Sequence, residues 1–149
     1  MVNYLLEDKY ILLHPPKSTT REYFGYKYLI KIKNKFKYIN KYDFLRSLVK
    51  FTAESISYNI DHFLEDIKID EVVISGGGAH HQLLVNDLKE NVSNLYLMNK
   101  YKISVDNKEA FLIAVLGYTC YNNIVNNMPS VTGASKDEIY GEIYEWKYF

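Results

Sequence analysis

Residues 72–84 read Val72-Val73-Ile74-Ser75-Gly76-Gly77-Gly78-Ala79-His80-His81-Gln82-Leu83-Leu84. An apolar run typical of a buried strand stops at three consecutive glycines, and an amphipathic pattern typical of a helix follows. Such a turn brings bare backbone N–H groups and a helix N-terminus to one point, which is a common way to hold phosphate. Glycine also serves turn geometry alone. The stretch therefore predicts a strand, a turn and a helix, and it leaves the ligand open.

The composition is that of one ordinary globular domain. The chain has 149 residues, of which 48% are hydrophobic and 24% are charged, and this length suffices for a core. Lys plus Arg and Asp plus Glu number 18 each, so no global field attracts nucleic acid or a membrane surface. The single cysteine, Cys120, excludes an internal disulfide and is expected on a core helix face. With no stretch of membrane-span length and no signal-peptide pattern, we expect a cytoplasmic protein.

Periodicity and capping residues predict the remaining elements. A short helix over residues 2–12 ends before Pro15 and Pro16. Thr19 and Glu22 predict a capping box, followed by a helix or an irregular segment up to residue 38. Apolar residues at three- and four-residue spacing predict a long helix over 41–66. The sequence further predicts a strand over 67–75, a helix over 80–91, a strand over 95–98, a helix over 107–124, and a short helix or strand after Pro129.

This order of elements predicts an α/β fold with a few parallel strands, joined by right-handed crossovers and flanked by helices. Only two strands are visible. A two-stranded parallel sheet is marginal, and its open edges invite pairing with another chain. The chain is therefore interpreted as part of a larger sheet. An independent doubly wound mononucleotide-binding protein is the least favoured interpretation, because it requires further strands.

Two patterns allow both a functional and a structural interpretation. The Lys-rich run over residues 27–37 is typical of a nucleic-acid or lipid patch, or of a solvated helix face; the neutral overall charge favours the latter. His80 and His81 are adjacent, so on a helix their side chains point about 100° apart and do not share a metal ion easily. Four dispersed histidines and no cysteine cluster predict no zinc site.

Four segments, in this order along the chain, carry a family resemblance. They are Pro15–Glu22, Phe51–Ala53 with Ser55 and Ile56, Ser75–His80 with Leu83 and Leu84, and Lys108–Phe111 together with Asn127–Ala134. These segments resemble the anhydro-N-acetylmuramic acid kinases, which belong to the actin, hexokinase and heat-shock ATPase superfamily. The resemblance covers almost all of this chain but only the C-terminal part of a family member. Thr20 and His81 depart from the family pattern, which has Gly and Asn there.

The resemblance implies an incomplete ribonuclease-H-like (actin-like ATPase) C-terminal domain over residues 1–149. The family's N-terminal domain, with its phosphate-binding motif and the Asp taken as catalytic base, is absent. ATP and Mg²⁺ are the cofactors that the resemblance implies. Because the motifs with the phosphate-binding residues and the catalytic base do not occur here, we identify no catalytic residue and no metal ligand in this sequence. The implied nucleotide contacts are Gly76, Gly77, Gly78 and His80. Glu109 is either a sugar contact or a carboxylate that stabilises a helix dipole. Lys17, Ser18, Thr19 and Arg21 either line the cleft or form a helix cap with a surface ion pair, and the second interpretation is slightly favoured. Thr132 and Gly133 are expected to form a tight turn that lines the cleft.

The parent activity that the resemblance implies is ATP-dependent phosphorylation and ring opening of 1,6-anhydro-N-acetylmuramic acid in cell-wall recycling. Our leading hypothesis is the ATP-binding C-terminal part of such a kinase, which is inactive alone: a truncated product, a fragment or one half of a split enzyme. Its expected partners are ATP and either a separately encoded N-terminal half or a second copy of the chain. The alternative hypothesis is a non-catalytic α/β interaction module that self-associates through its open sheet edge. Neither hypothesis includes nucleic acid or a membrane as a partner.

Overall fold

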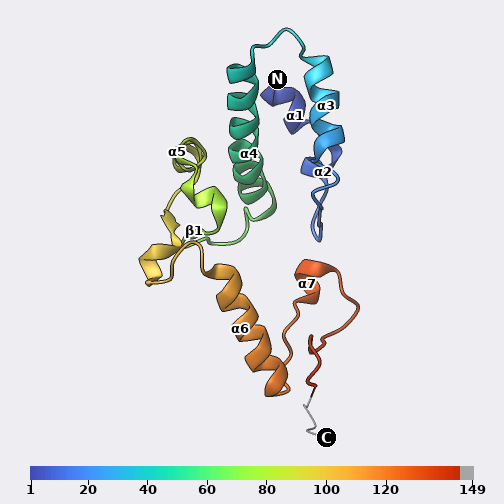
Figure 1. Cartoon of the computed structure of the whole chain (residues 1–149), viewed down its shortest axis with the longest axis vertical. Helices are drawn as coiled ribbons and strands as arrows, with labels where there is room; N and C mark the ends of the chain where they lie inside the picture. Colours follow the sequence, from blue (N-terminus) through green and yellow to red (C-terminus); the bar gives the residue numbers. More distant parts are fainter. Residues whose placement is uncertain (145–149) are drawn as a thin grey trace, which may run out of the picture.

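The computed structural model describes residues 1–144 and shows a mostly helical chain with one small sheet (Figure 1). The elements are α1 (Val2–Leu6), α2 (Lys9–Leu12), α3 (Tyr26–Lys35), α4 (Lys41–Phe63), β1 (Val72–Ile74), the 3₁₀ helix η1 (Gly77–His80), α5 (Gln82–Asn91), β2 (Leu95–Leu97), the 3₁₀ helix η2 (Met98–Tyr101), α6 (Lys108–Tyr121) and α7 (Pro129–Thr132). The two predicted strands are confirmed and are parallel. Both are shorter than predicted.

The sheet is covered on one face by α4 and α5. The strands pair in a register that places Val72 opposite Leu95 and Ile74 opposite Leu97. Val72, Ile74 and Leu95 pack on a buried cluster formed by Ala53 of α4 with Leu88 and Val92 at the end of α5. Since side chains alternate along a strand, Val73 lies on the opposite face, where 38% of it is exposed. The sheet, α4 and α5 therefore form a two-layer unit whose other sheet face is open.

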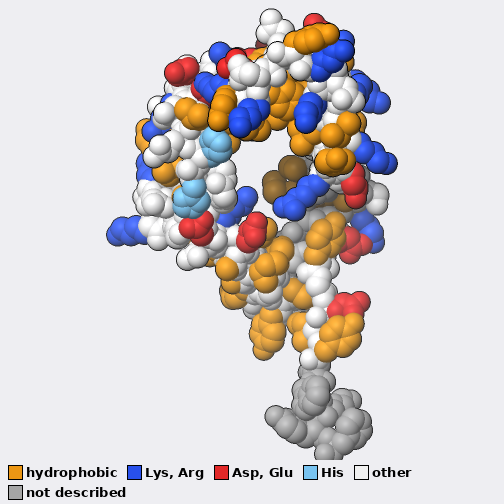
Figure 2. All heavy atoms as spheres, turned by 45° about the horizontal axis from the view of Figure 1, so that its top comes forward, with side chains coloured by type: hydrophobic (Ala, Val, Ile, Leu, Met, Phe, Trp, Pro, Cys, Tyr) orange, Lys and Arg blue, Asp and Glu red, His pale blue; other side chains and the backbone are white. Residues whose placement is uncertain are grey.

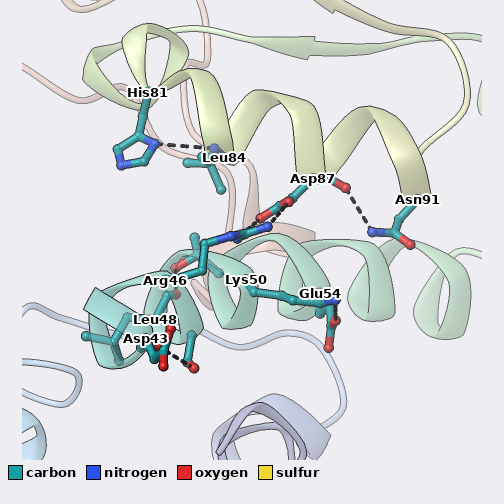
Figure 3. A network of polar contacts seen from close by, with 11 residues as sticks. Asp43, Arg46, Leu48, Lys50, Glu54, His81, Leu84, Asp87 and Asn91 are labelled. Atoms are coloured by element: carbon teal, nitrogen blue, oxygen red, sulfur yellow. Dashed lines mark hydrogen bonds and ion pairs between the residues drawn. The ribbon is translucent and has the colours of Figure 1, made fainter. Parts of the chain in front are cut away.

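Polar side chains hold α4 and α5 in place. Asn40 caps the first turn of α4 by accepting hydrogen bonds from the N–H groups of Tyr42 and Asp43. Arg46 of α4 reaches across to Asp87 of α5, as Figure 3 shows. Asn91 donates to the carbonyl of Asp87 one turn earlier. These contacts fix the long helix against the helix that follows the glycine turn.

The N-terminal residues form two short helices instead of the single predicted one. Asp8 accepts a hydrogen bond from the N–H of Tyr10 and so caps α2, which interrupts the helix because Asp favours caps over helix interiors. A second buried cluster joins these helices to α3 and α4 through Leu5, Ile11, Ile32 and Phe51. The lysines of the 27–37 run are exposed on and just after α3.

The predicted capping box at Thr19 and Glu22 is wrong. No helix begins there in the described chain, and α3 starts only at Tyr26, after Gly25. Glu22 instead folds back locally, since Thr20 Oγ1 donates to Glu22 Oε2 at 3.0 Å. A side chain bonded to its own neighbour stabilises a turn as readily as a helix start.

Helix α6 extends away from the rest of the molecule and leads to α7 and the C-terminal tail (Figure 1). It is almost entirely apolar, yet no residue of α6 is buried by the rest of the described chain. Cys120 is half-buried and packs near Gly141, so the expectation of a core cysteine is not met within residues 1–144. Among the described helices, none is both long and apolar enough to cross a membrane.

Candidate functional site

The glycine turn and the start of α6 enclose one polar pocket of about 240 Å³. Its lining residues are Ser75, Gly76, Gly77, Val105, Asp106, Lys108 and Glu109. Two of the motifs singled out in the sequence, the glycines and Glu109, thus meet in space although 31 residues separate Gly77 from Glu109. This is the place where the structure brings predicted site residues together.

The glycine turn differs locally from the predicted strand–turn–helix unit. Gly76 has a backbone φ of +78°, a conformation that side-chain-bearing residues adopt only with strain. Gly77 to His80 then form η1, and α5 begins only at Gln82, where His81 Nδ1 accepts a hydrogen bond from the N–H of Leu84 at 3.3 Å. The predicted helix start at residue 80 is therefore two residues too early. The N-terminus of α5 is already capped by His81.

Two contacts hold the turn against the segment that precedes α6. The N–H of Gly76 donates to the carbonyl of Val105 at 2.7 Å. The imidazole Nε2 of His80 lies 2.7 Å from Asp106 Oδ1. Both side chains are more than half exposed, at 58% and 62%, so the pair is accessible to water. Asp106 lines the pocket, whereas His80 does not.

The start of α6 supplies the charged groups of the pocket. Lys108 and Glu109 are the first two residues of the helix, and both are exposed. A lysine ammonium donates three hydrogen bonds, whereas a carboxylate only accepts them. The pocket can thus contact an anion through Lys108 and a hydroxyl group through Glu109. Residues 1–144 contain no cluster of three or more His, Cys, Asp or Glu side chains that could hold a metal ion.

Lys17 lies in a different part of the structure from the glycine pocket. Its Nζ donates to the carbonyls of Ile11 at 2.9 Å and Tyr10 at 3.4 Å, and it lies 4.4 Å from the centre of the Phe63 ring. Burial lowers the pKa of Lys17. The residue also lines an apolar cavity of about 570 Å³ between α2 and α4, which shares no lining residue with the glycine pocket. Lys17 thus caps the end of α2.

The other predicted cleft-lining residues are also outside the glycine pocket. Ser18, Thr19 and Arg21 are exposed and line neither of these two cavities. Gly133 ends α7 with a φ of +76° and donates its N–H to the carbonyl of Pro129 at 2.8 Å. Thr132 Oγ1 donates to the carbonyl of Met128 at 3.1 Å. The predicted tight turn at Thr132 and Gly133 is therefore present, and the structure does not bring it to the glycine pocket.

Three polar pocket residues were not predicted from the sequence. They are Ser75, Asp106 and Lys108, which line the pocket next to the predicted residues Gly76, Gly77 and Glu109. Ser75 and Lys108 are immediate neighbours of predicted residues, and that adjacency was the available signal. Asp106 lies just before a predicted helix, a position where a carboxylate ordinarily serves the helix itself, so the pattern alone did not single it out.

Comparison with known proteins identifies the family. The family model for anhydro-N-acetylmuramic acid kinase matches residues 1–146. The anhydro-N-acetylmuramic acid kinase of Clostridioides difficile (strain 630) is 39% identical over 146 residues, which are 96% of this chain and 38% of that relative. Those of Synechococcus elongatus and of Francisella tularensis subsp. novicida are each 37% identical, over 95% and 96% of this chain. The chain spans about 38% of the length of these relatives. By this match the chain belongs to the anhydro-N-acetylmuramic acid kinase family.

Proposed function

We propose that this chain is the C-terminal, nucleotide-side part of an anhydro-N-acetylmuramic acid kinase. As such it contributes to ATP-dependent phosphorylation and ring opening of 1,6-anhydro-N-acetylmuramic acid in the cytoplasm. The observation that carries the proposal is the pocket in which Gly76 and Gly77 face Glu109. Family membership supports the choice of ATP and of an anhydro sugar as ligands. Residues 1–149 then form one domain of a larger kinase.

Each residue that the sequence singled out has a role in this proposal, whether or not it lines the glycine pocket. The bare backbone of Gly76, Gly77 and Gly78 allows the phosphates or the ribose of ATP to approach closely. His80 positions the turn by its contact with Asp106. Glu109 accepts a hydrogen bond from a sugar hydroxyl group. Lys17, Ser18, Thr19, Arg21, Thr132 and Gly133 would line the cleft only when the remaining part of the kinase is in place.

Mg²⁺ fits this pocket only together with the nucleotide. Magnesium usually takes one or two carboxylates and completes its shell with phosphate oxygens and water. Asp106 and Glu109 are the carboxylates that line the pocket. When bound, the ion would neutralise charge on the transferred phosphoryl group. This chain orients the nucleotide beside it.

The isolated chain should bind ATP weakly and should not catalyse phosphorylation of the anhydro sugar. Ligand pockets of this kind bury most of their ligand between two domains, and the chain spans only about 38% of its relatives. Phosphoryl transfer also needs a base that activates the nucleophile, and no segment resembling that motif occurs in the sequence. Robust phosphorylation of the anhydro sugar by the isolated chain would contradict the proposal.

Calorimetry with ATP and Mg²⁺ tests the pocket through its glycines. A Cβ built at Gly77 meets no heavy atom within 4 Å in the described structure, so Gly77→Ala should leave the fold intact while placing a methyl group in the pocket. We expect this variant to weaken ATP binding about tenfold, because the added methyl group hinders the close approach of the nucleotide to the backbone. Gly117→Ala in α6 is the matched control, because Gly117 has the same free space and lies outside the pocket. Equal affinities of all three proteins would contradict the assignment.

One observation favours the alternative of a self-associating module. The exposed apolar side chains of α6 require a cover, and a second copy would provide one without any nucleotide. Sedimentation of the isolated chain distinguishes the two functions when it is combined with the calorimetry. A tight dimer that does not bind ATP would support the module, whereas ATP binding supports the kinase part.

A further inference from the structure

Positive charge is concentrated on the hairpin that α3 forms with the start of α4. Between Tyr26 and Arg46 the sequence contains six lysines and Arg46 against a single acidic residue, Asp43, which gives this stretch a net charge of +6. Because the whole chain is neutral, the remaining residues carry a net charge of −6. The neutral total favoured a solvated helix face for the lysine run, but it conceals this uneven distribution. A local field of one sign attracts partners of the opposite charge.

The hairpin also contains an apolar pocket, at the point where α3 leads into α4. Its volume is about 380 Å³, and its apolar wall is formed by Phe36, Ile39, Phe44 and Leu45. Leu45 is 59% exposed, so this wall is open to solvent. Apolar surface that a soluble protein leaves open is typical of a contact site.

Three lysines line the same pocket, namely Lys33, Lys37 and Lys41. All three are exposed. Within residues 1–144, none of their ammonium groups pairs with a carboxylate. The carboxylate of Asp43 instead accepts a hydrogen bond from Nδ2 of Asn40. The pocket therefore combines an apolar wall with three cationic groups that no acid in the described chain neutralises.

Two exposed tyrosines lie beside the pocket. Tyr38 is 90% exposed and Tyr42 is 71% exposed. Lys37 Nζ lies 5.0 Å from the centre of the Tyr38 ring, and Lys41 Nζ lies 4.9 Å from that of Tyr42. Figure 1 places the connection between α3 and α4 at the end of the molecule away from α6, and Figure 2 shows basic and hydrophobic side chains next to one another at that end. Tyrosine suits the boundary between an apolar and an aqueous phase, because one end of its ring is apolar and the other is polar.

We propose that this tip, residues 33–45, binds the surface of an anionic lipid bilayer. The three ammonium groups contact lipid phosphates, to which basic residues near an anionic membrane are attracted. The two tyrosines and Leu45 enter the boundary between headgroups and acyl chains, as the apolar face of an interfacial helix does. The tip shares no lining residue with the glycine pocket, so this inference goes beyond the proposed function and does not depend on it.

The chemistry of the tip favours a bilayer over two other anionic or apolar occupants. Single-stranded nucleic acid binds by stacking its bases on aromatic faces, whereas each tyrosine here has an ammonium group over its ring. The aliphatic side chains of Ile39 and Leu45 offer nothing that a base or a phosphate requires. A second copy of the chain brings a tip of the same charge, so two tips repel each other. A bilayer with anionic headgroups matches both the lysines and the apolar wall.

Flotation of the chain with lipid vesicles, in the absence of nucleotide, tests the proposal. We expect vesicles of equal parts phosphatidylglycerol and phosphatidylcholine to bind the chain at least about tenfold more tightly than vesicles of phosphatidylcholine alone. Binding should weaken as NaCl is raised from about 0.1 M to about 0.5 M, because salt screens exposed charges. These measurements use the unaltered chain, so they do not depend on a variant that folds.

Neutralising the lysines of the tip provides the charge variant. A protein carrying Lys33→Gln, Lys37→Gln and Lys41→Gln should bind anionic vesicles about a hundredfold more weakly, at roughly fivefold for each lysine. The matched control carries glutamine in place of three exposed lysines outside the tip, Lys68, Lys89 and Lys136. It has the same net charge and should bind within about threefold of the wild type, because attraction to the membrane falls off within a Debye length.

A second pair of variants tests the apolar wall. Leu45→Asn should weaken binding about fivefold, because it removes apolar surface that enters the lipid boundary. Leu13→Asn is its control, since Leu13 is similarly exposed, at 53% against 59% for Leu45, and does not line the pocket. Urea unfolding of all variants shows that each is folded.

Other outcomes overturn the inference. Equal binding to vesicles with and without phosphatidylglycerol would remove the role of charge, and equal binding by the two triple variants would place the contact elsewhere. A chain that binds a single-stranded oligonucleotide and no vesicles would make nucleic acid the occupant. A chain that binds ATP but does not float with anionic vesicles would reject the membrane contact alone. A chain that floats but binds no ATP would reject the proposed function and leave the membrane contact in place.

Discussion

Arg46 on α4 holds Asp87 on α5 by two parallel hydrogen bonds, from Nη1 to Oδ2 at 2.5 Å and from Nη2 to Oδ1 at 2.6 Å (Figure 3). The Asp87 side chain is only 9% exposed, so it depends on this partner. Arg46→Ala should therefore lower the free energy of unfolding by about 2 kcal/mol, the contribution of hydrogen bonds to a charged group. Urea denaturation measures the loss.

Lys50→Ala is the control for this substitution. Lys50 pairs with Glu54 one turn along the same helix, at 3.5 Å, and its side chain is 52% exposed. Exposed pairs of this type contribute about 0.3–0.5 kcal/mol. Equal losses for the two variants would show that the contact between Arg46 and Asp87 does not join the helices.

The same pair predicts how stability depends on pH. Hydrogen bonds from Arg46 hold the pKa of Asp87 below its ordinary value of 3.8. The stabilisation is therefore complete above the pKa of the unfolded chain and is lost as the pH falls through the lower pKa of the folded chain. Urea midpoints of the wild type should fall more steeply below about pH 4 than those of Asp87→Asn. Parallel curves for the two proteins would rule this contribution out.

The first two glycines of the turn should differ in what they do for stability. Gly76 has a φ of +78°, whereas Gly77 has no such constraint and has free space around it. Gly76→Ala should cost about 1–2 kcal/mol of unfolding free energy, because a Cβ is strained in that conformation. Gly77→Ala should stay within about 0.5 kcal/mol of the wild type. Thermal unfolding measures both losses. Equal decreases in the unfolding free energy of the two variants would contradict this prediction.

A charge on α6 should affect association and leave the isolated fold unchanged. Ile113 is 67% exposed, so Ile113→Lys should not alter the unfolding transition of the free chain by more than about 0.5 kcal/mol. We expect it to prevent association with the remaining part of the kinase, because a lysine that becomes buried among the apolar side chains of α6 without a partner is costly. Tyr26→Lys on α3, where Tyr26 is 78% exposed, is the control and should bind normally. Complex formation by both variants would remove α6 from the interface.

The sequence indicated the order of the main elements because their patterns are local. The spacing of apolar residues predicted α4, and the β-branched run before the glycines predicted β1. Local competition explains the errors. Asp8 accepts a hydrogen bond from the N–H of Tyr10 and so interrupts the predicted first helix. Thr20 bonds to Glu22, the residue that was expected to complete a capping box with Thr19.

The site could be predicted only in part because it is made by packing between distant segments. No local pattern places Asp106 beside His80 or Glu109 beside Gly77, since the chain between them folds through α5 and β2. The family resemblance singled out Gly77 and Glu109 separately. It singled out Lys17 as a possible cleft residue, and the contacts of its Nζ with the carbonyls that end α2 could not be predicted from the motif alone.

Titration of the ¹⁵N-labelled chain with Mg²⁺–ATP, followed by NMR, tests the nucleotide-side assignment most directly. We expect the amide signals of Gly76, Gly77, Lys108 and Glu109 to shift together as ATP is added, while those of α3 stay in place. Millimolar ATP that leaves the four signals unchanged, or that shifts residues around the 570 Å³ cavity in their stead, would contradict the assignment of this pocket to the nucleotide.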